Sequence, residues 1–172
     1  LFTNNINILS FIDTGCVTSV LEDAFKHCYN IHTIILPEVT DIETSVFHDC
    51  TSLVNISLPE LVNATSAAFN GCASLISISL PKVISIGSSF FNDCVLLQSA
   101  SLPLCLSIGS FAFNNCDALN SVYIPLCRNL GGTTGDDSVF DNANERDITI
   151  TIPSALMTVL SGNPDGDIQY LQ

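Results

Sequence analysis

The residues best suited to chemistry in this sequence are its eight cysteines, because thiolates bind zinc, form disulfides and act as nucleophiles. Five of them recur at every twenty-second position: Cys28, Cys50, Cys72, Cys94 and Cys116. Zinc needs ligands that converge on one point, often from C-x₂-C pairs, and the sequence contains no such pair. We therefore expect no structural zinc site, and interpret the five cysteines as small buried residues of a repeated core position.

The remaining cysteines lie outside that series. Cys105 and Cys127 are separated by the same interval, so a repeating structure would bring them close to disulfide range. Both a bond between them and two free thiols stay open. Cys16 stands beside Gly15 and is expected to be exposed.

Three histidines, His27, His32 and His48, provide the other groups suited to acid–base chemistry or metal binding. His27 and Asp49 occupy the same phase of the cysteine spacing, so their side chains are expected to lie side by side. We interpret them as a solvated surface pair. No nucleophile, base and orienting group can be assembled from these residues, so we predict no catalytic site, no metal site and no cofactor. The protein is not expected to be an enzyme.

Acidic residues concentrate near the C-terminal end, around a glycine-rich stretch at Gly131–Ser138. The group is Asp136, Asp137, Asp141, Glu145 and Asp147. Oxygen ligands on a glycine-rich loop are typical of Ca²⁺ sites, but the spacing matches no EF-hand. Calcium binding and simple solvation of this end both stay open.

Composition and charge argue against some classes of function. The chain has 172 residues, 47% of them hydrophobic, and a mean hydropathy of +0.46, which fits one domain with a sizeable core. With 17 acidic and 4 basic side chains, the formal net charge of -13 repels phosphate backbones and anionic lipids. No apolar run approaches the roughly 18 residues of a membrane span. We expect neither a nucleic-acid partner nor membrane insertion.

The cysteine spacing belongs to a repeat that runs through most of the chain. A phenylalanine precedes each cysteine of the series by three positions, and a proline recurs with the same period. These columns are Phe25, Phe47, Phe69, Phe91, Phe113 and Pro37, Pro59, Pro81, Pro103, Pro125. Two aliphatic columns begin at Leu9 and Ile12 and continue through Ile31 and Ile34. Each repeat is therefore one coil of a solenoid.

Within a coil, the pattern Leu-x-x-Ile-x-Leu-Pro alternates inward and outward residues, which predicts a short strand ended by proline. The three-residue step from Phe to Cys suits one helical or 3₁₀ turn on the opposite wall. Coils stacked at about 4.8 Å line one continuous core with like residues. The sequence predicts an α/β solenoid, with short parallel strands on the concave side and loop or 3₁₀ turns on the other wall.

This pattern resembles the BspA-like leucine-rich repeats, also called the Treponema pallidum type. The resemblance rests on segments such as Ile56–Leu61 and Ser107–Cys116, and covers about residues 9–130, with five well-kept turns. It implies a curved leucine-rich-repeat solenoid and a role in attachment of bacterial or protist surface proteins. Similar repeats also occur in phage tail and virion proteins. The family is known by its scaffold and not by a catalytic motif.

The repeat breaks near the C-terminal end. Pro125 and Pro153 are farther apart than one period of the repeat, and most of the insertion falls at 131–138. Isoleucines at 148, 150 and 152 then predict a strand, and the residues after Pro153 predict a short helix at 154–160. The expected divisions are a solenoid at 1–153, with an irregular start at 1–8 and an enlarged last repeat at 126–153, and a C-terminal cap at 154–172.

Residues that alternate with the buried strand positions form two outward columns rich in serine. They are Asn55, Ser77, Ser99, Ser121 in one column and Ser57, Ser79, Ser101, Tyr123 in the other. An uncharged strip of this kind suits a glycan or a protein loop, although small polar residues also simply tolerate close strand spacing. With Asp136 and Asp137 of the inserted loop, these are the candidate ligand-binding residues.

We therefore predict a non-catalytic recognition or adhesion module for a protein or glycan on a cell surface. Its expected location is extracellular, on a cell surface or on a virion, as part of a bacterial surface protein or a phage tail protein. The alternative is a structural spacer of a larger fibre or virion protein without a ligand of its own. The chain begins at Leu1 without a leader pattern, so we expect a processed or truncated product of a longer parent chain with further repeats or domains.

Overall fold

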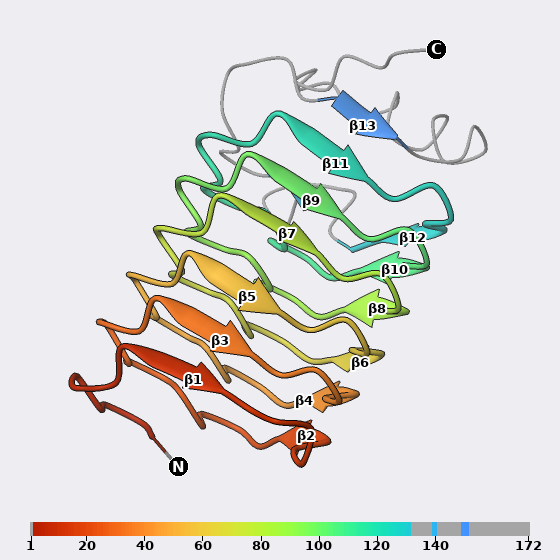
Figure 1. The fold of residues 1–172 in the computed structure, drawn as a ribbon. Helices are drawn as coiled ribbons and strands as arrows, with labels where there is room; N and C mark the ends of the chain where they lie inside the picture. The colour runs from red at the N-terminus through yellow and green to blue at the C-terminus, as the bar shows by residue number, and fades with distance from the viewer. Residues whose placement is uncertain (1, 132–138, 141–148, 152–172) are drawn as a thin grey trace.

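The protein is a solenoid of stacked coils, seen in a computed structural model that describes residues 2–131, 139–140 and 149–151. Each coil contributes a three-residue strand to one wall and a two-residue strand to a second wall (Figure 1). Turns form the rest of the coil. The predicted solenoid with short parallel strands is confirmed.

The first wall contains the odd-numbered strands β1 (Ser10–Ile12), β3 (Thr33–Ile35), β5 (Asn55–Ser57), β7 (Ser77–Ser79), β9 (Ser99–Ser101), β11 (Ser121–Tyr123) and β13 (Thr149–Thr151). The second contains β2 (Ser19–Val20), β4 (Asp41–Ile42), β6 (Asn63–Ala64), β8 (Ser85–Ile86), β10 (Ser107–Ile108) and β12 (Asn129–Leu130). All pairings are parallel, and the even-numbered strands form one continuous sheet. The sequence pattern predicted only the first row of strands.

The core is a set of stacked columns inside the coils. The phenylalanine column is continuous, with ring centroids 5.0 to 5.6 Å apart between successive rings and interplanar angles of 9° to 27°. Its members are Phe2, Phe25, Phe47, Phe69, Phe91, Phe113 and Phe140. Offset stacking of this kind adds to the burial of apolar surface that holds neighbouring coils together.

The third wall consists of turns, so the expected α/β class is not confirmed: the described residues form no helix. The three-residue step is present as turn hydrogen bonds, such as Cys28 N to Phe25 O at 3.1 Å. These turns do not continue into a 3₁₀ helix because Asp23 and His27 have positive φ values of 57° and 59°. The N–H of Phe25 then donates to Val46 O of the next coil at 2.9 Å.

The first coil is displaced by one residue from the predicted columns. Phe11, not Ile12, pairs with Ile34, so Ile8 and Phe11 pack against the core. Leu9 and Ile12, assigned inward from the sequence, are 62% and 61% exposed. The regular register begins only after a one-residue insertion between Ile12 and β2.

That insertion is stabilised by the Asp13 side chain. Asp13 Oδ2 accepts backbone hydrogen bonds from Gly15, Cys16 and Val17 at 3.0, 3.0 and 3.1 Å. These bonds, led by the one from Val17, hold the pKa of the Asp13 carboxyl below its usual value. A negative charge on Asp13 therefore favours the loop that shifts the register.

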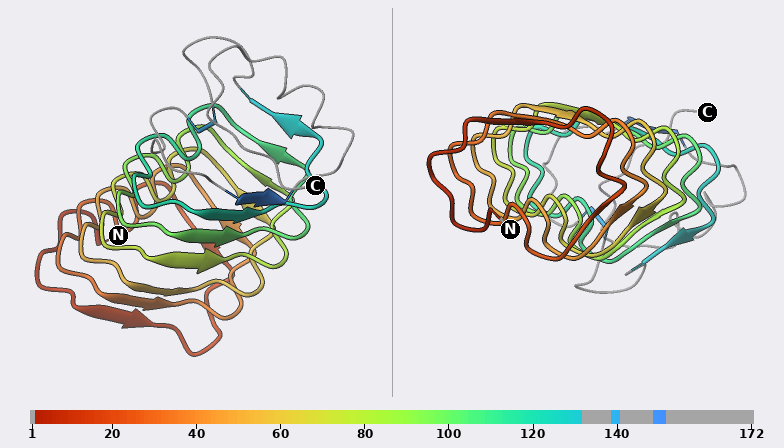
Figure 2. Two further views of the ribbon diagram at one scale, coloured as in Figure 1. Left: turned by 90° about the horizontal axis from the view of Figure 1, so that it is seen from above. Right: turned by 60° about the horizontal axis from the view of Figure 1, so that its bottom comes forward.

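The wall of odd-numbered strands is interrupted between β5 and β7. β1, β3 and β5 form one sheet, and β7, β9, β11 and β13 form another. In this fully described part of the chain no backbone hydrogen bond joins β5 to β7. The wider space between their ribbons is visible in Figure 1 and in the left view of Figure 2.

The repeat resumes after the insertion. Phe140 stacks on Phe113 with ring centroids 5.4 Å apart, and β13 pairs with β11, so a strand is present where the isoleucine alternation predicts it. The inserted loop at 132–138, the predicted helix at 154–160 and the cap at 154–172 lie outside the described residues. In the described ranges, no helix is long and apolar enough to cross a membrane.

Candidate functional site

The two outward columns of the first wall form one surface, which we call the serine face. Its residues are Asn55, Ser57, Ser77, Ser79, Ser99, Ser101, Ser121 and Tyr123. Strand register aligns them: Ser77 pairs with Ser99, and Ser79 with Ser101. The structure therefore brings these predicted residues onto one face, because side chains alternate along each strand and the coils are in phase.

A groove opens in the serine face at the interruption between β5 and β7. It comprises adjoining hollows of about 580 and 230 Å³. Ser57, Ser77 and Ser79 line its sides, and Ile56 and Ile78 lie deeper. The two isoleucines belong to the inward column, so the hollow reaches between the strands toward the core. No charged side chain is among its lining residues in the described part of the chain.

The groove also contains backbone N–H and C=O groups of the kind that form hydrogen bonds between successive coils elsewhere in this wall. Leu36 N donates to Ser57 O at 3.0 Å, and Leu80 N donates to Ser101 O at 3.0 Å. Among the described residues, the equivalent N–H of Leu58 makes no backbone hydrogen bond, and neither does the carbonyl of Val54. A donor and an acceptor are thus available at the groove, where a polypeptide backbone or a polar ligand can satisfy them.

The remaining candidate residues differ in position. Ser99 and Ser101 line the larger hollow, and Asn55 lines the smaller one. Ser121 and Tyr123 lie further along the same face, outside both hollows, and Tyr123 is 44% exposed. Asp136 and Asp137 lie outside the described residues.

The cysteines are placed as a structural column. All eight are free, Cys16 is exposed and the other seven are buried. Burial raises the pKa of the Cys72 and Cys94 thiols well above the usual value, so both stay protonated and are poor nucleophiles. Cys105 and Cys127, the pair left open by the sequence, are also free thiols.

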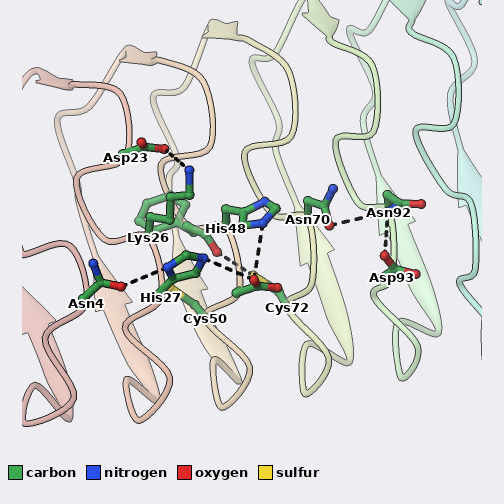
Figure 3. Close-up of polar contacts among 12 residues, drawn as sticks. Asn4, Asp23, Lys26, His27, His48, Cys50, Asn70, Cys72, Asn92 and Asp93 are labelled. Carbon is green, nitrogen blue, oxygen red and sulfur yellow. Dashed lines mark hydrogen bonds and ion pairs between the residues drawn. The ribbon is translucent and has the colours of Figure 1, made fainter.

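The structure adds a residue to the pair formed by His27 and Asp49. His27 Nε2 lies 3.4 Å from Asp49 Oδ2, and His48 Nε2 lies 3.3 Å from the same oxygen (Figure 3). The sequence indicates the first pair through its phase, but the contact of His48 with Asp49 was not predicted. The available sign was that His48 directly precedes Asp49 and therefore shares its turn.

Comparison with known proteins identifies the repeat. The sequence model of the BspA type leucine rich repeat region matches residues 18–145 in six copies. No curated protein sequence matches the chain. The chain is similar to a leucine rich cell surface protein from Faecalibacterium prausnitzii, with 26% identity and a TM-score of 0.60. That match covers 74% of this chain and 33% of the other, so this chain spans about a third of the length of that protein.

Two further crystal structures share the fold. The Treponema pallidum leucine rich repeat protein is 24% identical, with a TM-score of 0.66, over 91% of this chain and 85% of that one. A leucine-rich repeat protein from Bacteroides ovatus is 21% identical, with a TM-score of 0.53, over 85% and 48%. With the family match over most of the solenoid and these neighbours in fold, the chain belongs to the BspA-type leucine-rich repeat family.

Proposed function

We propose that this chain is a non-catalytic recognition module that binds an extended segment of a cell-surface protein in the groove of the serine face, with a glycan as the second candidate ligand. The observation that carries the proposal is the groove between β5 and β7, lined by Ser57, Ser77 and Ser79. Six of the ten residues predicted from the sequence for ligand binding line it, namely Asn55, Ser57, Ser77, Ser79, Ser99 and Ser101. Its uncharged lining avoids the desolvation of buried charge on binding.

The free backbone groups favour a protein segment over a glycan. The N–H of Leu58 and the carbonyl of Val54 have the spacing of a strand edge, because they flank the two ends of β5. An extended peptide offers both partners in its own backbone, and side chains at alternate positions can enter the apolar floor at Ile56 and Ile78. A glycan would engage mainly the serine hydroxyls.

An extracellular or cell-surface location is part of the proposal. It is supported by the F. prausnitzii neighbour, which is described as a cell surface protein. A phage tail or virion origin rests only on the occurrence of such repeats in those proteins. The inserted loop with Asp136 and Asp137 stays a second candidate contact, as predicted from the sequence.

The experiment is binding of the whole chain to arrays of displayed peptides, glycans and intact cells, followed by two matched variants. Ser79→Trp places a large ring in the groove, whereas Ser121→Trp makes the same change on the same face outside it. We expect Ser79→Trp to weaken binding at least tenfold and Ser121→Trp to leave it unchanged. Protease treatment of bound cells should remove binding, and deglycosylation should not.

Three results would overturn the proposal. Equal binding by Ser79→Trp and the parent chain would exclude the groove. Loss with deglycosylation alone would replace the protein ligand by a glycan. Failure of the parent chain to bind any array would favour the structural spacer, which is the alternative predicted from the sequence.

A further inference from the structure

The residues His27, His48 and Asp49 lie in turns of the third wall and not on the strands of the serine face. Figure 3 labels the two histidines. One nitrogen from each histidine and one carboxylate oxygen lie within 4.8 Å of one another. All three side chains are partly exposed, at 29%, 26% and 37%. The cluster joins two successive coils, since His27 belongs to one and the other two residues to the next.

The distances suit a small divalent cation. In a tetrahedral site with metal–ligand bonds of about 2.0 to 2.1 Å, neighbouring ligand atoms lie about 3.3 Å apart. The two histidine-to-Asp49 distances are 3.4 and 3.3 Å. Two of the three distances between ligand atoms therefore already fit a tetrahedral site. The third, between the two imidazole nitrogens, can be adjusted by rotation of the partly exposed rings.

The contact of His27 with Asn4 orients the ring for metal binding. His27 Nδ1 lies 2.9 Å from Asn4 Oδ1, and this contact is a hydrogen bond in the tautomer that carries the proton on Nδ1. In that tautomer Nε2, the nitrogen that faces Asp49, offers its lone pair to a metal ion. The bond from His27 to Asn4 then fixes the ring as outer-shell partners of metal ligands do.

The backbone holds the ligands in place. His27 N donates to His48 O at 2.8 Å, so the two coils are joined at the cluster itself. On the next coil, Gly71 occupies the phase of His27 and Asp49, and a Cβ there would lie 2.1 Å from Asp49 Oδ1. Glycine at this position leaves room for the carboxylate with Oδ2 directed at the two histidines.

We propose that His27, His48 and Asp49 bind one divalent transition-metal ion of the Zn²⁺ class, with a fourth position open to water or to a partner's side chain. Two imidazoles and one carboxylate are the ligand set of such ions and not of Ca²⁺ or Mg²⁺, which take oxygen ligands. The ion cross-links two coils on the turn wall. The sequence-based expectation of no metal site counted His48 among the three histidines but did not place it beside Asp49.

The test is a titration of the chelator-treated whole chain with Zn²⁺ against a chromophoric competitor, in a Cys16→Ser background that removes the exposed thiol. The variants are His27→Asn, His48→Gln and Asp49→Asn. Asparagine tolerates the left-handed backbone found at His27 and Asp49. His32→Asn is the matched control, because the contact of His32 Nδ1 is the Asn30 carbonyl, away from the cluster.

We expect one Zn²⁺ per chain, a rise in the thermal midpoint on adding it, and at least a tenfold loss of affinity in each cluster variant but not in the control. Bound Co²⁺ should show a spectrum without thiolate charge transfer. The proposal is overturned by equal affinity in parent and cluster variants, by a thiolate band, by stabilisation with Ca²⁺ instead, or by no Zn²⁺ binding at millimolar concentration. Circular dichroism of each metal-free variant separates loss of ligands from loss of folding.

Discussion

The thiol of Cys72 donates a hydrogen bond to the backbone carbonyl of Phe47, with 3.2 Å between sulfur and oxygen. The bond crosses from one coil to the previous one, and it recurs along the solenoid. Cys50 bonds to Phe25 O, Cys94 to Phe69 O and Cys116 to Phe91 O, each at 3.1 Å. Each core cysteine thus fills a small buried space and also gives its weak donor a partner.

Replacing Cys72 with alanine should therefore destabilise the fold without changing it. The side chain is fully buried, so removing the sulfur leaves a small cavity and deletes the bond to Phe47. We expect the free energy of unfolding to fall by about 1–3 kcal/mol, measured by urea denaturation. Cys16→Ala, at an exposed cysteine, should change it by less than about 0.5 kcal/mol. Equal effects at the two sites would contradict this account of the column.

The columns could be predicted from the sequence because buried residues recur at fixed positions of the repeat. The cysteines, the phenylalanines and the serine face all follow from side-chain type and a constant period. The turn wall was predicted only as loop or 3₁₀ turns, because a three-residue apolar step is common to 3₁₀ turns and to isolated β-turns. The positive φ values at Asp23 and His27 distinguish isolated β-turns from a 3₁₀ helix. A backbone angle cannot be read from the apolar pattern of the sequence.

The register of the first coil, the groove and the His48 contact could not be predicted either, for related physical reasons. Leu9 and Ile12 fit the apolar columns by type, and the extra residue that moves them outward lies in a loop without a hydrophobic pattern. The groove could not be predicted because Ser57, Ser79 and Ser101 are identical serines, while the interruption depends on pairing between β5 and β7. The His48 contact depends on how two turns meet.

Thiol reactivity should separate Cys16 from the other cysteines. In the native protein at about pH 8, a thiol reagent should modify Cys16 rapidly, since the remaining cysteines are buried and react only on local opening. In denaturant all eight should react. The measurement is a time course of modification with mass analysis of the labelled peptides. Rapid native labelling of Cys105 or Cys127 would show that the last coils are less well packed than the structure has them.

Alkaline pH should weaken the fold through the buried thiols. Burial raises the pKa of Cys116 to about 12, whereas an unfolded cysteine titrates near about 8.5. Between these values the unfolded chain has lost this proton and the folded chain has kept it. Stability from this group is therefore complete below about pH 8.5 and declines as pH rises toward about 12.

The measurement is the free energy of unfolding from urea at a series of pH values between about 8 and 11. Cys116→Ala removes one titrating thiol and should make the decline shallower, by up to about 1.4 kcal/mol per pH unit. The rest of the sequence is the same in both proteins, so the difference between the two declines reports on the Cys116 thiol. Parallel declines in the two proteins would mean that the Cys116 thiol already ionises in the folded state.

Two successive coils are in close backbone contact at Gly109, and this contact leads to a prediction about stability. A Cβ at this position would lie 2.4 Å from Ser88 N and 2.6 Å from Gly87 C. Both are backbone atoms, which can move only if the coils separate. At the equivalent position, two earlier coils have Glu43 and Thr65 in place of glycine. The close contact between coils at this position therefore occurs only in the later coils.

Gly109→Ala should therefore lower the free energy of unfolding by about 2–3 kcal/mol, whereas Ser110→Ala, at the next residue, should change it by less than about 0.5 kcal/mol. Because a solenoid transmits strain mainly to neighbouring coils, and the clash lies between the coils of β8 and β10, amide exchange should accelerate first in β8 and β10 and least in β2 and β4. Gly109 does not need a left-handed backbone, since its φ lies outside that region. An alanine tolerated there would thus show that the coils separate easily, and that glycine is not required for their contact.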